Sequence, residues 1–245
     1  MKIIIQPKFT IKYRLPKYYN MEIFANLFNT VHKLALWLID FLIPREKSEK
    51  ALAEMTAERF LSKAKSSLPF NVSNAKALFS YKDRLVKDAI WLLKYRQNRK
   101  AAEILGTLLG NVAAEWLEDL ATFENFNNPL LVPIPMGKIR RAERGSNHCE
   151  ALCEEMLKAM PLETVTYAPL ALSKIRETAS QARTKNRAER LKNLSGSFNA
   201  NPKIVRGRNI LLIDDVITTG ATIDEARRTL QASGASKIYC LTIAH

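Results

Sequence analysis

One stretch, residues 209–222, constrains the fold of this chain more than any other. It reads Asn-Ile-Leu-Leu-Ile-Asp-Asp-Val-Ile-Thr-Thr-Gly-Ala-Thr. Its apolar run at residues 210–213 is unbroken, which is typical of a strand buried on both faces of a parallel sheet. Such a strand needs helices on both sides of the sheet. The stretch therefore predicts an α/β fold.

Two acids and a hydroxyl-rich loop follow this strand. Asp214 and Asp215 stand at its carboxyl end, where open α/β sheets bind their ligands. A helix predicted over residues 223–232 comes after the loop, so the N–H groups of both would face a common point, as in phosphate sites. The loop residues are Thr218, Thr219, Gly220, Ala221 and Thr222. An acid pair beside a phosphate cradle suits a ribose 5-phosphate.

Other interpretations of the acid pair compete with this one. The strand could be the magnesium strand of a P-loop ATPase, but none of the eight glycines belongs to a G-x-x-x-x-G-K-[ST] sequence. The pair could also be an isolated Mg²⁺ site of a phosphatase or receiver domain, or of a Mg²⁺-dependent phosphohydrolase. In those cases the Thr-Thr-Gly-Ala-Thr loop would be accidental.

Residues 209–222 resemble the phosphoribosyl pyrophosphate (PRPP) motif of type I phosphoribosyltransferases. In that family the acids hold the ribose hydroxyls and the loop holds the 5-phosphate. The resemblance implies a type I phosphoribosyltransferase-like parallel sheet flanked by helices, with Mg²⁺ bound through PRPP. It gives the catalytic role to Asp214 and Asp215, assigns the 5-phosphate to residues 218–222, and implies displacement of pyrophosphate at ribose C1.

Two basic segments are candidates for the pyrophosphate side of the site. Lys138, Arg140, Arg141 and Arg144 follow a strand predicted over residues 130–134. Together with a helix predicted over residues 148–160, this segment can bind anionic oxygens. In type I phosphoribosyltransferases the corresponding loop holds the pyrophosphate, so the resemblance implies a pyrophosphate contact, for which Arg144 is our candidate. The alternative is a solvated basic loop.

Residues 174–208 carry ten positive and two negative charges. We expect this segment to be partly a flap over the site, contributing Arg176 and Arg187, and partly a helix over residues 185–193. The same charge would suit a nucleic-acid groove, and the sequence does not separate the two interpretations.

Several further motifs together resemble the ComF/GntX family of competence-associated phosphoribosyltransferase-like proteins. They are Leu93-Lys94-Tyr95, Val132-Pro133-Ile134-Pro135, Arg144-Gly145-Ser146-Asn147, Arg176-Glu177-Thr178 with Gln181, and residues 187–198. Members commonly carry a cysteine-rich zinc module after a Phe-Pro or Ile-Pro step. Here Ile43-Pro44 is present, but the next segment has no cysteine and is predicted to be helical.

This resemblance implies a connection with DNA uptake and natural transformation. The predicted function is a PRPP-binding phosphoribosyltransferase-like protein of the ComF type, and the acceptor substrate is not identified. The alternative is a non-catalytic accessory protein that keeps the fold and binds single-stranded nucleic acid. The implied partners are PRPP, single-stranded DNA and a DNA-uptake helicase, with a homodimer as a further prediction.

The predicted organisation has two parts. Residues 1–74 form a basic arm and helices over 21–43 and 46–65, and residues 75–245 form the phosphoribosyltransferase-like domain, with a core at about 129–245. In the second part we expect further helices over 82–95 and 101–120 and strands over 75–81, 164–168 and 237–243.

The amino-acid composition narrows the expected partners and the expected cellular compartment of the protein. The net charge of +14 and pI near 9.8 favour polyanionic partners such as nucleic acid or nucleotides. Three cysteines are too few for a disulfide framework, which favours the cytoplasm. The longest apolar stretch, residues 34–43, is too short to span a bilayer, and we expect neither membrane insertion nor a secretory signal. Cys149 and Cys153 have only His148 nearby, which disfavours a zinc site.

Overall fold

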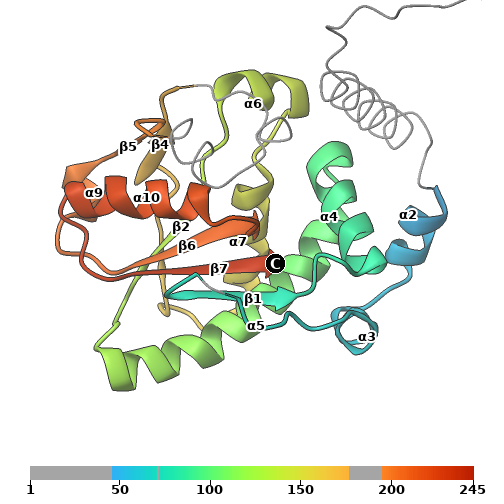
Figure 1. Ribbon diagram of the computed structural model, residues 1–245. Helices are drawn as coiled ribbons and strands as arrows, with labels where there is room; N and C mark the ends of the chain where they lie inside the picture. The colour runs from blue at the N-terminus through green and yellow to red at the C-terminus, as the bar shows by residue number, and fades with distance from the viewer. Residues whose placement is uncertain (1–45, 71, 177–194) are drawn as a thin grey trace, which may run out of the picture. The chain divides into compact units, whose positions relative to one another are not determined.

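Five strands form a wholly parallel sheet, as the apolar run at residues 210–213 predicts. Their order across the sheet is β1-β7-β6-β2-β3. Figure 1 labels the first four of these strands. In chain order they are β1 (Ala75–Phe79), β2 (Leu130–Pro133), β3 (Thr166–Tyr167), β6 (Ile210–Val216) and β7 (Ile238–Ala244).

The computed structural model describes residues 46–70, 72–176 and 195–245. The basic arm and the helix expected over residues 21–43 lie outside these ranges, and so does the helix expected over residues 185–193. The division of the chain at residues 74 and 75 stays a prediction.

Each face of the sheet is buried in its own core. Leu211 and Ile213 of β6 pack in a core with α4 (Arg84–Arg96), α5 (Arg99–Glu124) and α7 (His148–Ala159). Ile210 and Leu212 pack in a second core with α10 (Ala221–Ala232). This alternation follows from the two-residue period of a strand, and it confirms that β6 is buried on both faces.

Helix α4 reaches the site with its last turn. Asp83 caps its start by accepting hydrogen bonds from the N–H groups of Leu85 and Val86. Gln97 ends the helix in a left-handed conformation, with φ of 48°. The helix expected over residues 82–95 is therefore confirmed.

Helices α5 and α7 pack closely because α5 has glycine at the contact. A Cβ at Gly106 would lie 2.4 Å from the Cβ of Glu155, and one at Gly110 would lie 2.9 Å from the carbonyl oxygen of Met156. The missing side chains let the two backbones approach each other. This contact fixes α7, whose first residues face the acid pair.

The single helix expected over residues 46–65 is wrong. Two helices occupy this segment, α2 (Glu46–Ala53) and α3 (Ala57–Lys63). The side chain of Thr56 accepts a hydrogen bond from the Arg59 N–H and so starts a new helix in the middle of the predicted one.

Four short elements were not predicted at all. They are α6 (Lys138–Arg144), β4 (Leu172–Lys174), β5 (Phe198–Ala200) and α9 (Pro202–Val205). Strands β4 and β5 pair in an antiparallel hairpin, which packs with α10 on the second core. Within the described ranges, no helix combines the length and apolar character needed to cross a membrane.

Candidate functional site

The acid pair lies where the chain connections of the sheet change direction. From β2 the chain continues to β3 at one edge, whereas from β6 it continues to β7 on the other side. Strands β2 and β6 are neighbours, so the switch point of the sheet lies between them. Open parallel sheets bind ligands at the carboxyl ends of such strands. Asp214 and Asp215 stand there, 8% and 5% exposed.

The surroundings of Asp214 disfavour the charged form of its side chain. Its Oδ1 accepts the Asp215 N–H at 2.9 Å and lies 3.8 Å from the Cys149 sulfur. Burial raises the pKa of Asp214 from 3.8 to about 6, although Lys94, the Cys149 thiol and Lys174 each lower it. Desolvation therefore outweighs the nearby cations.

Asp215 faces nitrogen atoms from two helices. The ammonium of Lys94, from α4, contacts Oδ2, and the His148 Nε2 at the start of α7 lies 3.0 Å from the same atom. Both nitrogen groups thus converge on one oxygen of the buried Asp215 carboxylate.

The two nitrogen groups around Asp215 differ in charge. Burial, together with the positive charges of Lys94, Arg144 and Arg140, lowers the pKa of His148 to about 3, so its imidazole is neutral at physiological pH. Burial also lowers the pKa of Lys94 to about 8, although Asp214 raises it. Lys94 is therefore the main positive charge that contacts Asp215 in the ligand-free protein.

The predicted 5-phosphate loop joins β6 to α10. Gly220 is the residue before the helix and has φ of 79°, a left-handed conformation that glycine adopts easily. A Cβ at this position would also lie 3.1 Å from the Val72 side chain. Gly220 has no side chain with which to cap the helix, and the dipole and N–H groups of the first turn face the loop.

The Arg-Gly-Ser-Asn motif joins α6 to α7 and is held by the end of α4. The Gln97 amide donates to the Arg144 carbonyl oxygen, and its Oε1 accepts a hydrogen bond from the Ser146 hydroxyl at 3.2 Å. The Arg144 guanidinium lies over the Tyr95 ring, 4.6 Å from its centroid. A Cβ at Gly145 would come within 2.6 Å of Gln97 Nε2.

Asn147 completes this junction from the α7 side. Its amide donates to the Ile134 carbonyl oxygen at 3.1 Å, and its Oδ1 accepts the Cys149 N–H at 3.1 Å. The side chain thus ties the carboxyl end of β2 to the start of α7. The resulting frame fixes His148 and Arg144 beside the acid pair.

The predicted flap belongs to the connection that follows β4 and leads to β5. The Arg176 guanidinium donates to the Ser195 carbonyl oxygen at 3.0 Å, which brings together the two ends of the segment between them. Lys174 is near enough to Asp214 to lower its pKa. Arg187 lies outside the described residues, so the flap itself stays a prediction.

The predicted site residues that lie together in the structure belong mainly to one continuous stretch of the chain. Asp214, Asp215 and the 218–222 loop follow one strand, and Arg144 is linked to Lys94 through its effect on the Lys94 pKa. Arg176 contacts the Ser195 carbonyl oxygen instead.

Sequence reasoning missed Lys94, Gln97 and His148 as site residues. The signal for Lys94 was the Leu93-Lys94-Tyr95 motif, which had no function attached to it.

The residues fit Mg²⁺ only together with ligand oxygens. Within the described ranges there is no group of three acidic, histidine or cysteine side chains that could hold a metal ion. Two carboxylates supplemented by substrate phosphates are a usual way to bind Mg²⁺.

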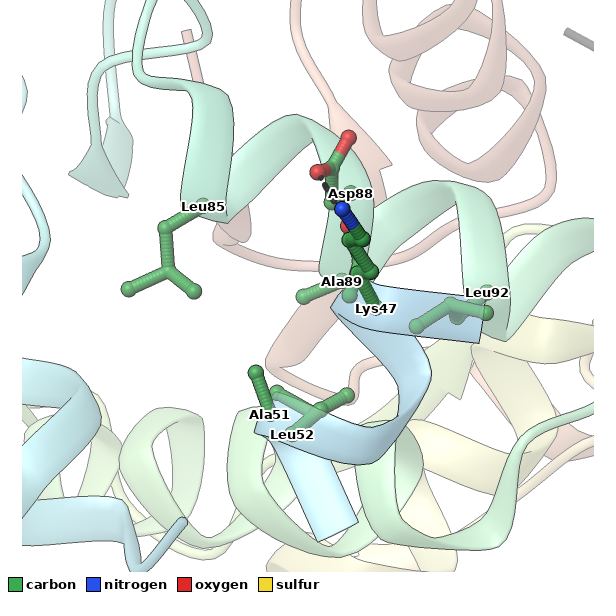
Figure 2. A pocket seen from close by; sticks show the side chains of 8 residues that line it. Lys47, Ala51, Leu52, Leu85, Asp88, Ala89 and Leu92 are labelled. Carbon is green, nitrogen blue, oxygen red and sulfur yellow. Dashed lines mark hydrogen bonds between the residues drawn. The ribbon is translucent and has the colours of Figure 1, made fainter. Parts of the chain in front are cut away.

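A separate cavity of about 190 Å³ lies between α2 and α4 (Figure 2). The Ser48 hydroxyl donates to Asp88 Oδ2 at 2.8 Å at its polar side, and the rest of its lining is mainly apolar. The lining residues are Lys47, Ser48, Ala51, Leu52, Leu85, Asp88, Ala89 and Leu92. None of the acid-pair or loop residues lines it.

Comparison with known proteins agrees with this geometry. The phosphoribosyl transferase domain family matches residues 107–245. The competence protein ComFC of Bacillus subtilis (strain 168) is 31% identical over 170 residues, which cover 69% of this chain and 62% of that protein. ComFC of Streptococcus pneumoniae is 37% identical over 137 residues, 56% of each protein.

The DNA utilization protein YhgH of Escherichia coli (strain K12) is 30% identical over 113 residues, which cover 45% of this chain and 48% of that protein. The chain thus spans about half of the curated relatives it matches, and 62% of the Bacillus protein.

Proposed function

This chain belongs to the phosphoribosyl transferase domain family, and on that premise we propose that it binds PRPP and displaces pyrophosphate at ribose C1. The observation that carries the proposal is the buried acid pair at the switch point of the sheet, next to the uncapped helix start after Gly220. A sugar diol and a 5-phosphate need these two features side by side.

The proposed reaction uses positioning and charge. The bond between ribose C1 and the pyrophosphate oxygen breaks, and its electron pair leaves with pyrophosphate. A lone pair of the acceptor forms the new bond to C1. Asp214 and Asp215 hold the ribose hydroxyls, the 218–222 loop holds the 5-phosphate, and Arg144 stabilises the charge on the leaving group.

Mg²⁺ fits this proposal as an ion carried with PRPP and held by Asp214 and Asp215. The chemistry it supplies when bound is neutralisation of charge on the pyrophosphate oxygens. Arg176 and Arg187 belong to the proposed flap, whose role is to add positive charge and to exclude water from C1.

A second candidate function is binding of single-stranded nucleic acid, with the fold retained and catalysis absent. It is favoured by the basic helix α6, where Lys138 and Arg141 are exposed, and by the names of the relatives, which refer to competence and DNA utilization. A DNA-uptake helicase as partner and a homodimer are proposals of the same kind.

Calorimetric titration with PRPP, with and without Mg²⁺, tests the first function. We expect Mg²⁺-dependent binding in the unmodified protein and none in the variant that carries Asp214→Asn and Asp215→Asn. Absence of binding in the unmodified protein would reject the proposal. An acceptor screen with nitrogen bases and amines follows from a positive result.

Titration with single-stranded DNA at increasing salt tests the second function. Phosphate contacts by Lys138 and Arg141 predict a steep loss of affinity with salt, and charge reversal at both residues should weaken binding further. Affinity that is independent of salt would contradict this candidate. The double Asp→Asn variant should bind DNA as well as the unmodified protein does.

A further inference from the structure

Lys94 lies in the acid-pair site but comes from outside the part of the chain that matches the family. The match covers residues 107–245, whereas Lys94 stands in the last turn of α4. Its side chain is 22% exposed and contacts the Asp215 side chain, which is 8% exposed. A lysine whose charge is this poorly solvated needs a carboxylate or another anion beside it.

Several charges besides Asp215 act on the Lys94 ammonium. Asp214 attracts it, whereas Arg140 and Arg144 repel it. If Asp215 accepts hydrogen bonds from a sugar, Lys94 shares its direct partner with that sugar and stays close to two arginines. An anionic oxygen of the ligand at this point would give the ammonium a new partner.

The contact with Asp215 is also one that can be exchanged. The Lys94 ammonium forms an ion pair with Asp215 Oδ2 from the end of a side chain that is still partly exposed. An ammonium group has three donors on a flexible stem, which lets it move between a carboxylate and a phosphate oxygen without rebuilding the helix.

We propose that Lys94 is a further ligand-binding residue, which neutralises Asp215 in the empty site and binds a pyrophosphate oxygen of PRPP in the occupied one. The proposal rests on the proposed function and adds to it a residue that the family match does not include. Asp215 keeps its charge when it accepts ribose hydroxyls, and a pyrophosphate oxygen of PRPP becomes the direct partner of the Lys94 ammonium.

The surroundings of Lys94 assign it to the pyrophosphate and not to the 5-phosphate. The end of α4 is joined to the α6–α7 junction through Gln97, Arg144 and Ser146. Tyr95, the neighbour of Lys94, carries the Arg144 guanidinium on its ring. Lys94 and Arg144 are therefore held on one frame, whereas the 5-phosphate loop belongs to α10.

The test compares three ligands on the full chain: PRPP, inorganic pyrophosphate and ribose 5-phosphate, each titrated by calorimetry in Mg²⁺. With Lys94→Met, affinity for PRPP and pyrophosphate should fall at least about tenfold, while affinity for ribose 5-phosphate stays within about threefold. Lys87→Met is the matched control, because Lys87 is an exposed lysine on the same helix.

Two results would overturn the proposal. If Lys94→Met binds PRPP as well as the Lys87→Met control does, Lys94 is not a ligand-binding residue. If the affinities for all three ligands fall together, its role is to hold Asp215 in place. Should Lys94→Met fail to fold, Lys94→Gln removes the charge and keeps a donor for Asp215, and the same ligand pattern is expected. Failure of the unmodified protein to bind PRPP is a different outcome, which rejects the proposed function and this inference with it.

A thermal double-variant cycle checks the empty state without any ligand. Lys94→Met and Asp215→Asn remove the same contact, so the Tm shift of the combined variant should differ from the sum of the two single shifts. Additive shifts would contradict the pairing of the two side chains.

Discussion

Two buried carboxylate sites lie on consecutive elements of this fold, and their surroundings satisfy them in opposite ways. Glu225 on α10 is 4% exposed and accepts the Gly196 N–H at 2.7 Å and two hydrogen bonds from the Arg228 guanidinium at 2.8 Å each. Asp214 on β6 is equally buried, but burial dominates its environment.

The pKa directions express this contrast. The Arg228 hydrogen bonds lower the pKa of Glu225, whereas desolvation raises that of Asp214 to about 6. A carboxylate whose oxygens accept hydrogen bonds from the protein contributes to the stability of the fold. One that is desolvated and incompletely paired costs stability, and such a group is typical of a site awaiting a ligand.

The largest expected difference between the two sites is in ligand affinity. Asp215→Asn should weaken PRPP binding by at least about 100-fold, because it removes a charged acceptor from the ribose site. Glu225→Gln, a matched acid-to-amide change at a buried position, should alter affinity by less than about threefold. Calorimetric titration measures both. Equal losses in the two variants would remove the distinction between the sites.

Stability should change in opposite directions at the two sites. Asp214→Asn removes a charge that burial disfavours, so at neutral pH the free energy of unfolding should rise by on the order of 2 kcal/mol. Glu225→Gln loses the ion pair with Arg228 and should lower it by about 1 kcal/mol. Urea titration checks the signs, and a loss of stability in Asp214→Asn would contradict the comparison.

Each carboxylate site also has its own glycine. Gly220 and Gly196 both have positive φ, 79° and 68°, so alanine at either should cost about 1 kcal/mol in backbone conformation. Gly220→Ala should also weaken PRPP binding by about tenfold, because its Cβ would meet Val72 and shift the loop, whereas nothing lies within 4 Å of a Cβ at Gly196. Unchanged PRPP affinity in Gly220→Ala would separate this loop from the ligand.

The smallest expected effect is a pH dependence at Glu225. The pKa of Glu225 is lower in the folded protein than the ordinary value of 4.5. Its charge therefore stabilises the folded protein fully at pH values above 4.5, and this contribution is lost as the pH falls from 4.5 through the lower pKa of the folded state. The difference in unfolding free energy between the unmodified protein and Glu225→Gln should therefore shrink in acid. Urea titration across this range measures it, and a constant difference would show that the charge of Glu225 does not matter.

The part of the site that could be predicted from the sequence is local. The apolar run, Asp214, Asp215 and the Gly220 loop follow one another directly, so strand burial and helix-start chemistry identify them without any long-range information. The resemblance to the ComF/GntX family is confirmed by the similarity to ComFC and YhgH. The type I phosphoribosyltransferase-like fold is confirmed by the family match and the parallel sheet.

What could not be predicted depends on packing between distant segments. Lys94 and Asp215 are far apart in the sequence, and only the placement of α4 against the sheet brings them together. No local pattern marks Gln97 as the residue that holds Arg144. The basic helix α6 was missed because its segment was predicted to be a basic loop that binds pyrophosphate, with a solvated loop as the alternative. The three-residue strands β4 and β5 are too short to show a period.

Thermal unfolding with and without PRPP and Mg²⁺, applied to three proteins, tests the central claim most directly. The unmodified protein and Glu225→Gln should gain equal increases in Tm from the ligand, although Glu225→Gln melts lower without it. Asp214→Asn should melt at or above the Tm of the unmodified protein and gain nothing from the ligand. A full ligand-induced shift in Asp214→Asn, or none in the unmodified protein, would contradict the assignment of the acid pair to PRPP.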